Sequence, residues 1–193
     1  YVTGTSNLVN STVSTNRALF FMKLSSTGQL LDFKTYGISS SAIKASVAEM
    51  NSTGNTHFII AGHTSTEILL LKLNADGTVA ASQNYDPSFS YYLETVDLTV
   101  MNNGTSSPEI YILGNVFASF TDEYPFIMRL DKNLATLQFK EFKNNESVIP
   151  TTVAGITFDQ FPAMRASRFY QDLNNALVVV GSKDLLVNTT NSI

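Results

Sequence analysis

The sequence has 193 residues, enough for one sizeable hydrophobic core, and its hydrophobic content of 44% is normal for a globular domain. The net charge of −4, without a basic block, offers nucleic acid no attractive surface. No apolar run approaches the about 20 residues of a membrane-spanning helix, so we expect no membrane insertion. The chain has no cysteine, which excludes disulfides and thiol catalysis.

One stretch of the sequence occurs three times and gives the chain its organisation. Each copy contains a basic residue (Lys23, Lys72 or Arg129) that is directly followed by leucine, and each copy ends on an aromatic residue. Repetition of this kind indicates a repeat architecture. The copies are residues 19–36, 67–85 and 125–142.

Each copy is predicted to form a β-hairpin, because a short apolar run leads through turn residues into a second strand. In the first two turns, Gly28 and Gly77 suit a left-handed backbone conformation, where a Cβ atom would clash. The third turn has Leu134 there, which is a poor fit, whereas Asn133 tolerates a positive φ. We therefore expect the third hairpin to be built differently.

The second strand of the first hairpin alternates in character. Leu31, Phe33 and Thr35 point to one side, and Asp32 and Lys34 point to the other. This pattern predicts a half-buried outer strand beside a fully apolar inner strand.

Two further segments precede the hairpins. An alternating segment is clearest at 43–50 and 95–100 and weaker at 161–170, and in the second of these Val96 and Leu98 are expected to share a face with Val100. A short run of β-forming residues follows and ends in glycine. These glycines are Gly4, Gly62, Gly114 and Gly181.

The repeat therefore comprises four strands, and four antiparallel strands in about 40–50 residues are typical of a β-propeller blade. We predict an all-β fold of tandem four-stranded antiparallel sheets, β-propeller-like, with two full and two partial blades in a single domain. The first strand of each blade would line the axis and the last would be the outer edge. The blade segments are 1–37, 38–86, 87–143 and 144–193.

The ends of the sequence fall inside blades. The chain begins at Tyr1, without methionine, on the second strand of one blade and stops after the second strand of another. This favours a mature form or an excerpt of a longer chain, or partial blades that another chain completes. An unpaired strand would leave a sheet edge on which a neighbour could pair.

The segments FFMKLSSTGQLLDFKTYG and FIIAGHTSTEILLLKLNADGTVAASQNY resemble the SBBP-type β-propeller repeats of extracellular proteins. In that family a run such as FLVKLDxxGxxxWxxxYG follows YVxGxTxS, and YVTGTS at the start of this chain is similar to the second motif. The resemblance covers most of the chain but departs in the absence of tryptophan, so that Phe33 and Phe139 would supply the outer-strand aromatic. It implies a repeat type and no particular activity.

Five N-x-[ST] sequons are candidate N-glycosylation sites, and all fall in predicted loops, with Asn51 and Asn103 at equivalent positions. The alternative is a chance origin in a chain rich in Asn, Ser and Thr. Occupied sequons would place the protein outside the cell or at its surface, through a eukaryotic secretory route, with N-linked glycans over the loops. The sequons begin at Asn10, Asn51, Asn103, Asn145 and Asn188.

The motifs of common enzymes and metal sites are absent from the sequence. The spacing of His57 and His63 suits no zinc pair, so we expect loop or strand-end positions for them. There is no serine-hydrolase elbow, calcium loop or phosphate loop. Asp122 and Glu123 could form a glycosidase pair, but adjacent carboxylates on a strand point apart, which favours a solvated loop.

Three neighbouring aromatic residues, Phe89, Tyr91 and Tyr92, are the one candidate binding site. They could stack on a sugar ring or a partner chain, or they could cap a hydrophobic layer between blades.

The sequence thus predicts a non-catalytic, extracellular, N-glycosylated structural scaffold without cofactor or metal, which assembles with itself into a surface coat or filament. The alternative is a glycan- or protein-binding propeller module of an adhesin or secreted enzyme. A third possibility is an enzyme whose active residues lie in other blades.

Overall fold

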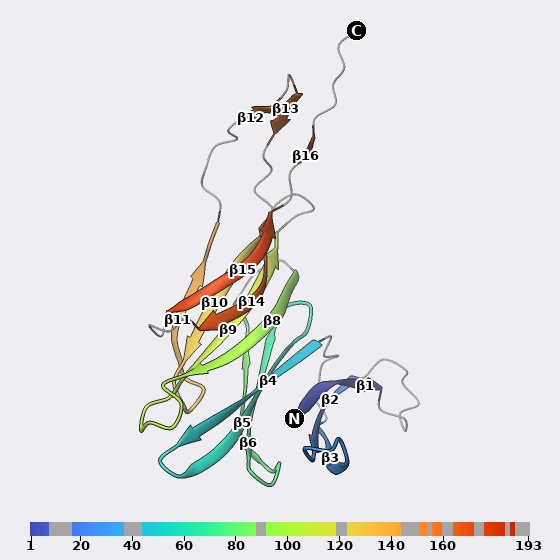
Figure 1. Ribbon diagram of the computed structural model, residues 1–193, viewed down its shortest axis with the longest axis vertical. Coiled ribbons are helices and arrows are strands. Elements are labelled where there is room, and N and C mark those ends of the chain that lie inside the picture. The colour runs from blue at the N-terminus through green and yellow to red at the C-terminus, as the bar shows by residue number, and fades with distance from the viewer. Residues whose placement is uncertain are drawn as a thin grey trace.

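The computed structural model is all-β, and its described residues contain strands and turns but no helix (Figure 1). The structure describes residues 1–7, 17–36, 44–87, 92–118, 123–143, 151–153, 156–159, 164–171, 176–183 and 186–187. The strands are β1 (Val2–Asn7), β2 (Arg17–Leu24), β3 (Leu30–Tyr36), β4 (Lys44–Ser52), β5 (Asn55–His63), β6 (Ile68–Asn74), β7 (Val79–Tyr85), β8 (Tyr92–Met101), β9 (Glu109–Phe117), β10 (Glu123–Leu130), β11 (Thr136–Glu141), β12 (Thr151–Val153), β13 (Ile156–Asp159), β14 (Met164–Gln171), β15 (Leu177–Lys183) and β16 (Leu186–Val187).

Two complete four-stranded antiparallel sheets lie in the middle of the chain, as predicted. We name them sheet 2 (β4-β5-β6-β7) and sheet 3 (β8-β9-β10-β11). Sheet 1 (β1-β2-β3) has the last three strands of the same pattern, and sheet 4 (β14-β15) has the first two. The small sheet β12-β13-β16 lies apart from these four, near the C-terminal end in Figure 1.

The hairpins of sheets 1, 2 and 3 share one irregularity. The ladder shifts register directly after Lys23 in the first, after Lys72 in the second and after Arg129 in the third. A β-bulge of this kind sets two residues opposite one and bends the strand locally. Because the three bulges occupy the same position, the internal repeat predicted around these basic residues is present in the backbone.

The three hairpin turns also share one backbone conformation, so the prediction of a different third turn is wrong. Gly28 and Gly77 have φ of 81° and 77°, and Leu134 adopts the same conformation with φ of 70°. Leucine is strained in this region. Leu134 is, however, fully buried in the core between sheets 2 and 3, and that burial offsets the strain.

An alanine variant is usually more stable than a glycine variant at the same position, but at Leu134 we expect the reverse. Leu134→Ala loses the buried side chain but keeps a Cβ atom at positive φ, whereas Leu134→Gly loses the side chain and the strain together. We expect Leu134→Ala to be less stable than Leu134→Gly by about 1 kcal/mol. Urea denaturation of both variants checks this, and a more stable alanine variant would contradict it.

The sheets pack face to face in chain order. Leu19 and Phe21 of β2 pack on β5 and β6 of sheet 2. The largest cluster lies between sheets 2 and 3 and includes Leu70 of β6 and Phe126 of β10. Leu113 of β9 packs on β14 of sheet 4. The inner strands of sheets 2 and 3 are therefore covered on both faces, which explains their continuous apolar runs.

The outer strand β3 alternates as predicted, but its apolar side is the exposed one. Leu31 and Phe33 are 57% and 50% exposed, whereas Lys34 on the other side is half-buried. On β11 the equivalent residue, Phe139, stacks on Tyr85 of sheet 2 with ring centroids 5.5 Å apart. Within the described chain no sheet covers this face of sheet 1, so its apolar residues meet solvent.

Candidate functional site

A row of buried polar residues joins sheet 2 to sheet 3 and sheet 3 to sheet 4. Its members directly follow the strand glycines, at His63 in β5 and Asn115 in β9. The Asn115 side chain accepts a hydrogen bond from the Ala166 backbone N–H at 2.8 Å and donates one to the Ala166 carbonyl at 3.2 Å. This amide therefore pairs with β14 as a strand backbone would, and it fixes sheet 4 against sheet 3.

His63 makes the equivalent contact between sheets 2 and 3. Its Nδ1 lies 3.0 Å from the backbone nitrogen of Thr95 and 3.0 Å from Thr95 Oγ1. Thr95 pairs with Gly114 as Ala166 pairs with Gly181, so the two contacts occupy the same place in the repeat. Since the Thr95 N–H can only donate, Nδ1 accepts and the ring proton resides on Nε2.

The His63 ring is fully buried, and this burial lowers its pKa to about 4. The neighbouring Glu94 carboxylate opposes the shift, and Lys44 adds to it. Nε2 is buried without a hydrogen-bond partner in the described chain. His63 therefore holds the strand-end position expected for it, in a site built for the neutral ring. His57 lies within β5 and also has a lowered pKa, first from burial and then from Lys72.

Ion pairs join the same sheets at this end of the strands. Lys44 of β4 pairs with Glu94 of β8 at 3.0 Å, and Arg165 of β14 donates two hydrogen bonds to the Glu123 carboxylate of β10. Glu123 is buried and begins a strand, so its prediction as part of a solvated loop is wrong. Asp122 lies outside the described residues. Glu94 and Glu123 thus form ion pairs across the interfaces between sheets.

The predicted aromatic site is only partly described. Phe89 and Tyr91 lie outside the described residues. Tyr92, which begins β8, is 41% exposed and makes edge contacts with Phe117 and His63, at ring-centroid distances of 5.3 Å and 6.4 Å. One side of Tyr92 thus covers the buried polar row, as a capping residue would, and its other side meets solvent.

Two of the five sequons lie in the described chain, and they touch each other. Asn51 is the penultimate residue of β4, so its prediction as a loop residue is corrected, and Asn103 lies in the turn after β8. The Asn103 side chain accepts a hydrogen bond from the Asn51 N–H and donates one to the Glu49 carbonyl at 3.1 Å. Asn103 thus clamps the turns of sheets 2 and 3 together. Asn10, Asn145 and Asn188 lie outside the described residues.

The clamp and the predicted glycan at Asn103 can be separated by mutation. Asn103→Ala removes both, and losing two hydrogen bonds between turns is expected to lower the free energy of unfolding by about 1 kcal/mol. Thr105→Ala removes the sequon and two exposed hydrogen bonds of the Thr105 hydroxyl within the turn, but it leaves the contacts of Asn103 with sheet 2 in place. We expect it to abolish glycosylation at Asn103, measured by intact mass, with less effect on stability. Equal destabilisation by both variants would show that the clamp is not the stabilising element.

The described residues contain no group of three histidine or acidic side chains that could hold a metal ion, and no helix long and apolar enough to cross a membrane. Neither the protein-family models nor the curated proteins contain a match to this chain. The resemblance to SBBP-type repeats therefore stays a prediction that rests on the chain's own motifs. Sequence reasoning missed Asn115, Thr95 and Arg165. The signal that could have found Asn115 is its place directly after a repeated glycine.

Proposed function

We propose that this chain is a non-catalytic, extracellular structural scaffold of β-propeller-like repeats, N-glycosylated on its loops, which assembles with copies of itself. The observation that carries the proposal is the presence of open apolar faces at both ends of the stack of sheets. Leu31 and Phe33 are exposed on sheet 1, and Val178 and Val180 are 44% and 47% exposed on sheet 4. Their counterparts on the middle sheets include Ile59 and Ala61, which are fully buried.

The contacts between first strands support the propeller-like arrangement. Ser46 of β4 donates to the Val96 carbonyl of β8 at 3.4 Å, and Asp97 of β8 accepts from the Phe169 N–H of β14 at 2.8 Å. The first strands of successive sheets therefore lie beside one another, while β3, β7 and β11 form the other edge of their sheets. Blades around a common axis have this arrangement, with the first strand innermost.

The polar contacts between the sheets support a structural role over a catalytic one. The buried polar groups of the row pair across interfaces, through His63 and Thr95 and through Asn115 and Ala166. Such pairs fix the orientation of one sheet on the next without offering a reacting group to solvent. Apolar faces that stay exposed at both ends favour heterologous, head-to-tail contacts, which extend into chains or close into rings.

Light scattering of the purified glycoprotein over a concentration series, together with electron microscopy, tests the proposal. We expect concentration-dependent growth into linear or ring-shaped oligomers, weakened by Phe33→Lys on the open face of sheet 1. Thr35→Lys, on the same exposed side of β3 but without an apolar group to lose, is the matched control. A monodisperse monomer at the highest concentration would overturn the proposal.

The alternative, a glycan-binding module, is favoured by the exposed side of Tyr92 alone. It predicts glycan-array binding that is lost in Tyr92→Ala. Retention of binding in that variant, or no binding at all, would leave Tyr92 with its capping role.

A further inference from the structure

We propose that the free edge of β15 and the pocket beside it form an acceptor site for an added β-strand of the repeat's own sequence type, with a phenylalanine seated opposite Gly181. The inference rests on the proposed self-assembly and names the surface that would receive the incoming strand. Its acceptor is sheet 4, in which the described residues form the first two strands of the pattern.

The edge of β15 is open within the described chain. β15 pairs with β14 along one side, whereas the equivalent strands β5 and β9 each pair on both sides. Val178, Val179 and Val180 are 40–47% exposed, although the equivalent residues of β5 are fully buried. An apolar strand with unpaired N–H and C=O groups along one edge is a template for strand addition.

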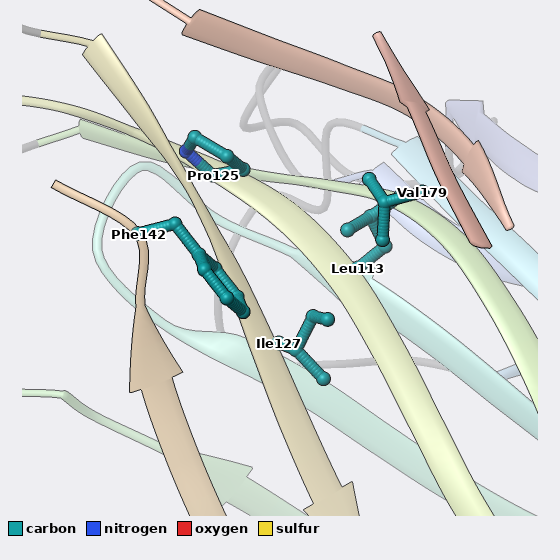
Figure 2. Close-up of a pocket in the computed structure, with 5 residues that line it drawn as sticks. All are labelled: Leu113, Pro125, Ile127, Phe142 and Val179. Carbon is teal, nitrogen blue, oxygen red and sulfur yellow. The ribbon is translucent and has the colours of Figure 1, made fainter. Parts of the chain in front are cut away.

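The pocket lies directly below this edge, between sheets 3 and 4. It has a volume of about 300 Å³, and its lining is apolar throughout. Figure 2 shows Pro125 and Ile127 projecting from β10, with Phe142 beside them and Val179 approaching from β15. Leu113 of β9 completes the lining.

The repeat shows what fills this pocket elsewhere in the molecule. The residues equivalent to its lining are Ala61, Ile68, Leu70, Tyr85 and Ile112, and all five belong to the core between sheets 2 and 3. Phe126 belongs to the same cluster, is fully buried and stacks on Phe139. Phe126 belongs to β10, the strand that is paired with β9. The pocket is thus the same socket without the strand that would supply its phenylalanine.

The register of the incoming strand follows from the other sheets. Gly4 pairs with Phe20 and Gly114 pairs with Phe126, while Leu69 takes this place opposite Gly62. A strand added antiparallel to β15 would therefore set an aromatic or large apolar residue opposite Gly181. Its sequence type is that of β2, β6 and β10, in which three apolar residues precede a basic residue and leucine. We assign the site to such a strand, since its backbone would pair with β15 and its phenylalanine would enter the pocket.

A synthetic peptide with the sequence of β2 (Arg17–Leu24), carrying photoreactive benzoylphenylalanine in place of Phe20, tests the site on the full chain. We expect saturable binding by fluorescence anisotropy and cross-links to Leu113, Ile127, Phe142 or Val179, identified by mass spectrometry. Hydrogen exchange should show new protection of β15. A control peptide with Phe20→Asp should bind at least about tenfold more weakly, because a carboxylate would enter an apolar pocket.

Two chain variants supply the matched comparison. Val179→Asp puts a charge into the pocket and should weaken peptide binding by about tenfold or more. Val180→Asp, one residue along on the opposite and exposed face, should change binding by no more than about twofold. Both positions are exposed enough to keep the fold, which circular dichroism verifies. Equal effects of the two variants, or cross-links outside the pocket, would overturn the inference.

The results of these experiments distinguish a failure of the acceptor site from a failure of the proposed self-assembly. Self-assembly that the peptide neither joins nor inhibits would leave the scaffold standing and overturn the acceptor site. Peptide binding to a chain that never assembles would support the acceptor site and overturn the scaffold. Capture of a fatty-acid probe in the pocket, with no competition from the peptide, would assign the cavity to a small apolar ligand instead.

Discussion

Gly114→Ala is expected to lower the free energy of unfolding by about 3 kcal/mol or more. A Cβ atom on Gly114 would overlap ring carbons of Phe126 and the carbonyl oxygen of Glu94. The ring is fully buried and the carbonyl belongs to the backbone of β8, so neither can move without disturbing the core or the ladder. Urea denaturation followed by circular dichroism measures the loss.

Two other strand glycines, Gly62 and Gly4, provide graded controls. At Gly62 the nearest atoms are the Lys44 carbonyl oxygen at 3.0 Å and a methyl carbon of Leu19 at 3.2 Å, so Gly62→Ala should cost about 1 kcal/mol. At Gly4 only the Phe20 ring is close, at 2.7 Å. Phe20 lies half-buried on the open face of sheet 1 and can rotate away, so Gly4→Ala should cost least. Equal costs at all three positions would contradict this order.

A β-bulge explains why Gly114 is the tightest of these three positions. The β8–β9 ladder shifts register between Thr95 and Asp97, opposite Gly114, which brings the β8 backbone over the glycine. The β4–β5 ladder is regular opposite Gly62. The sequence could not predict this bulge, because Val96, Leu98 and Val100 alternate cleanly. In the structure Leu98 and Val100 join the core, whereas Val96, the extra residue, does not.

The strands of the repeat and their order could be predicted because the same sequence pattern occurs three times along the chain. Turn chemistry predicted the conformation at Gly28 and Gly77 but failed at Leu134, where tertiary burial outweighs the local preference for glycine. A preference of about 1 kcal/mol is smaller than the gain from burying a leucine, about 2 kcal/mol. Local rules therefore hold where nothing distant competes with them.

Contacts between sheets could not be predicted, because they join residues far apart in sequence. The prediction for Glu123 treated its neighbour Asp122 as the relevant group, whereas its partner is Arg165. The row formed by His63 and Asn115 likewise becomes visible only when each sheet is placed against the next. Sequence periodicity indicates which residues of a strand share a face but carries no information on which polar group meets that face.

Acidification is expected to destabilise the protein through His63. Its pKa of about 4 in the folded chain lies below the ordinary value of 6.5 that it has when unfolded. Above pH 6.5 the ring is neutral in both states and the full stability is present. Between pH 6.5 and 4 the unfolded chain binds a proton that the folded chain does not, so stability falls as the pH falls, by about 3 kcal/mol in total.

His63→Asn should remove most of this pH dependence. Asn115 shows that an amide suits the equivalent position, where it pairs with the backbone of the next sheet. The smaller side chain will leave a cavity, but its cost is the same at every pH. Urea denaturation at pH 7, 5.5 and 4.5 should give nearly the same free energy of unfolding for this variant at all three pH values. For the native chain the free energy of unfolding should fall as the pH falls. The half-buried His57 ring also has its pKa lowered by burial, so His57→Asn measures its separate share of the loss and leaves the share of His63 in place.

The acidic groups act in a lower pH range than His63, whereas His57, whose pKa is also lowered by burial, acts in the same range and is removed separately by His57→Asn. Glu109 has its pKa lowered below 4.5 by its hydrogen bond with Arg129, so the stability it contributes is lost only as the pH falls through that lower value. A pH profile that stays flat from 6.5 to 4.5 in the native chain would show that His63 accepts a proton in the folded state. Its contact with Thr95 would then have to be made by an imidazolium, which cannot accept the Thr95 N–H, so sheets 2 and 3 would meet differently at this point.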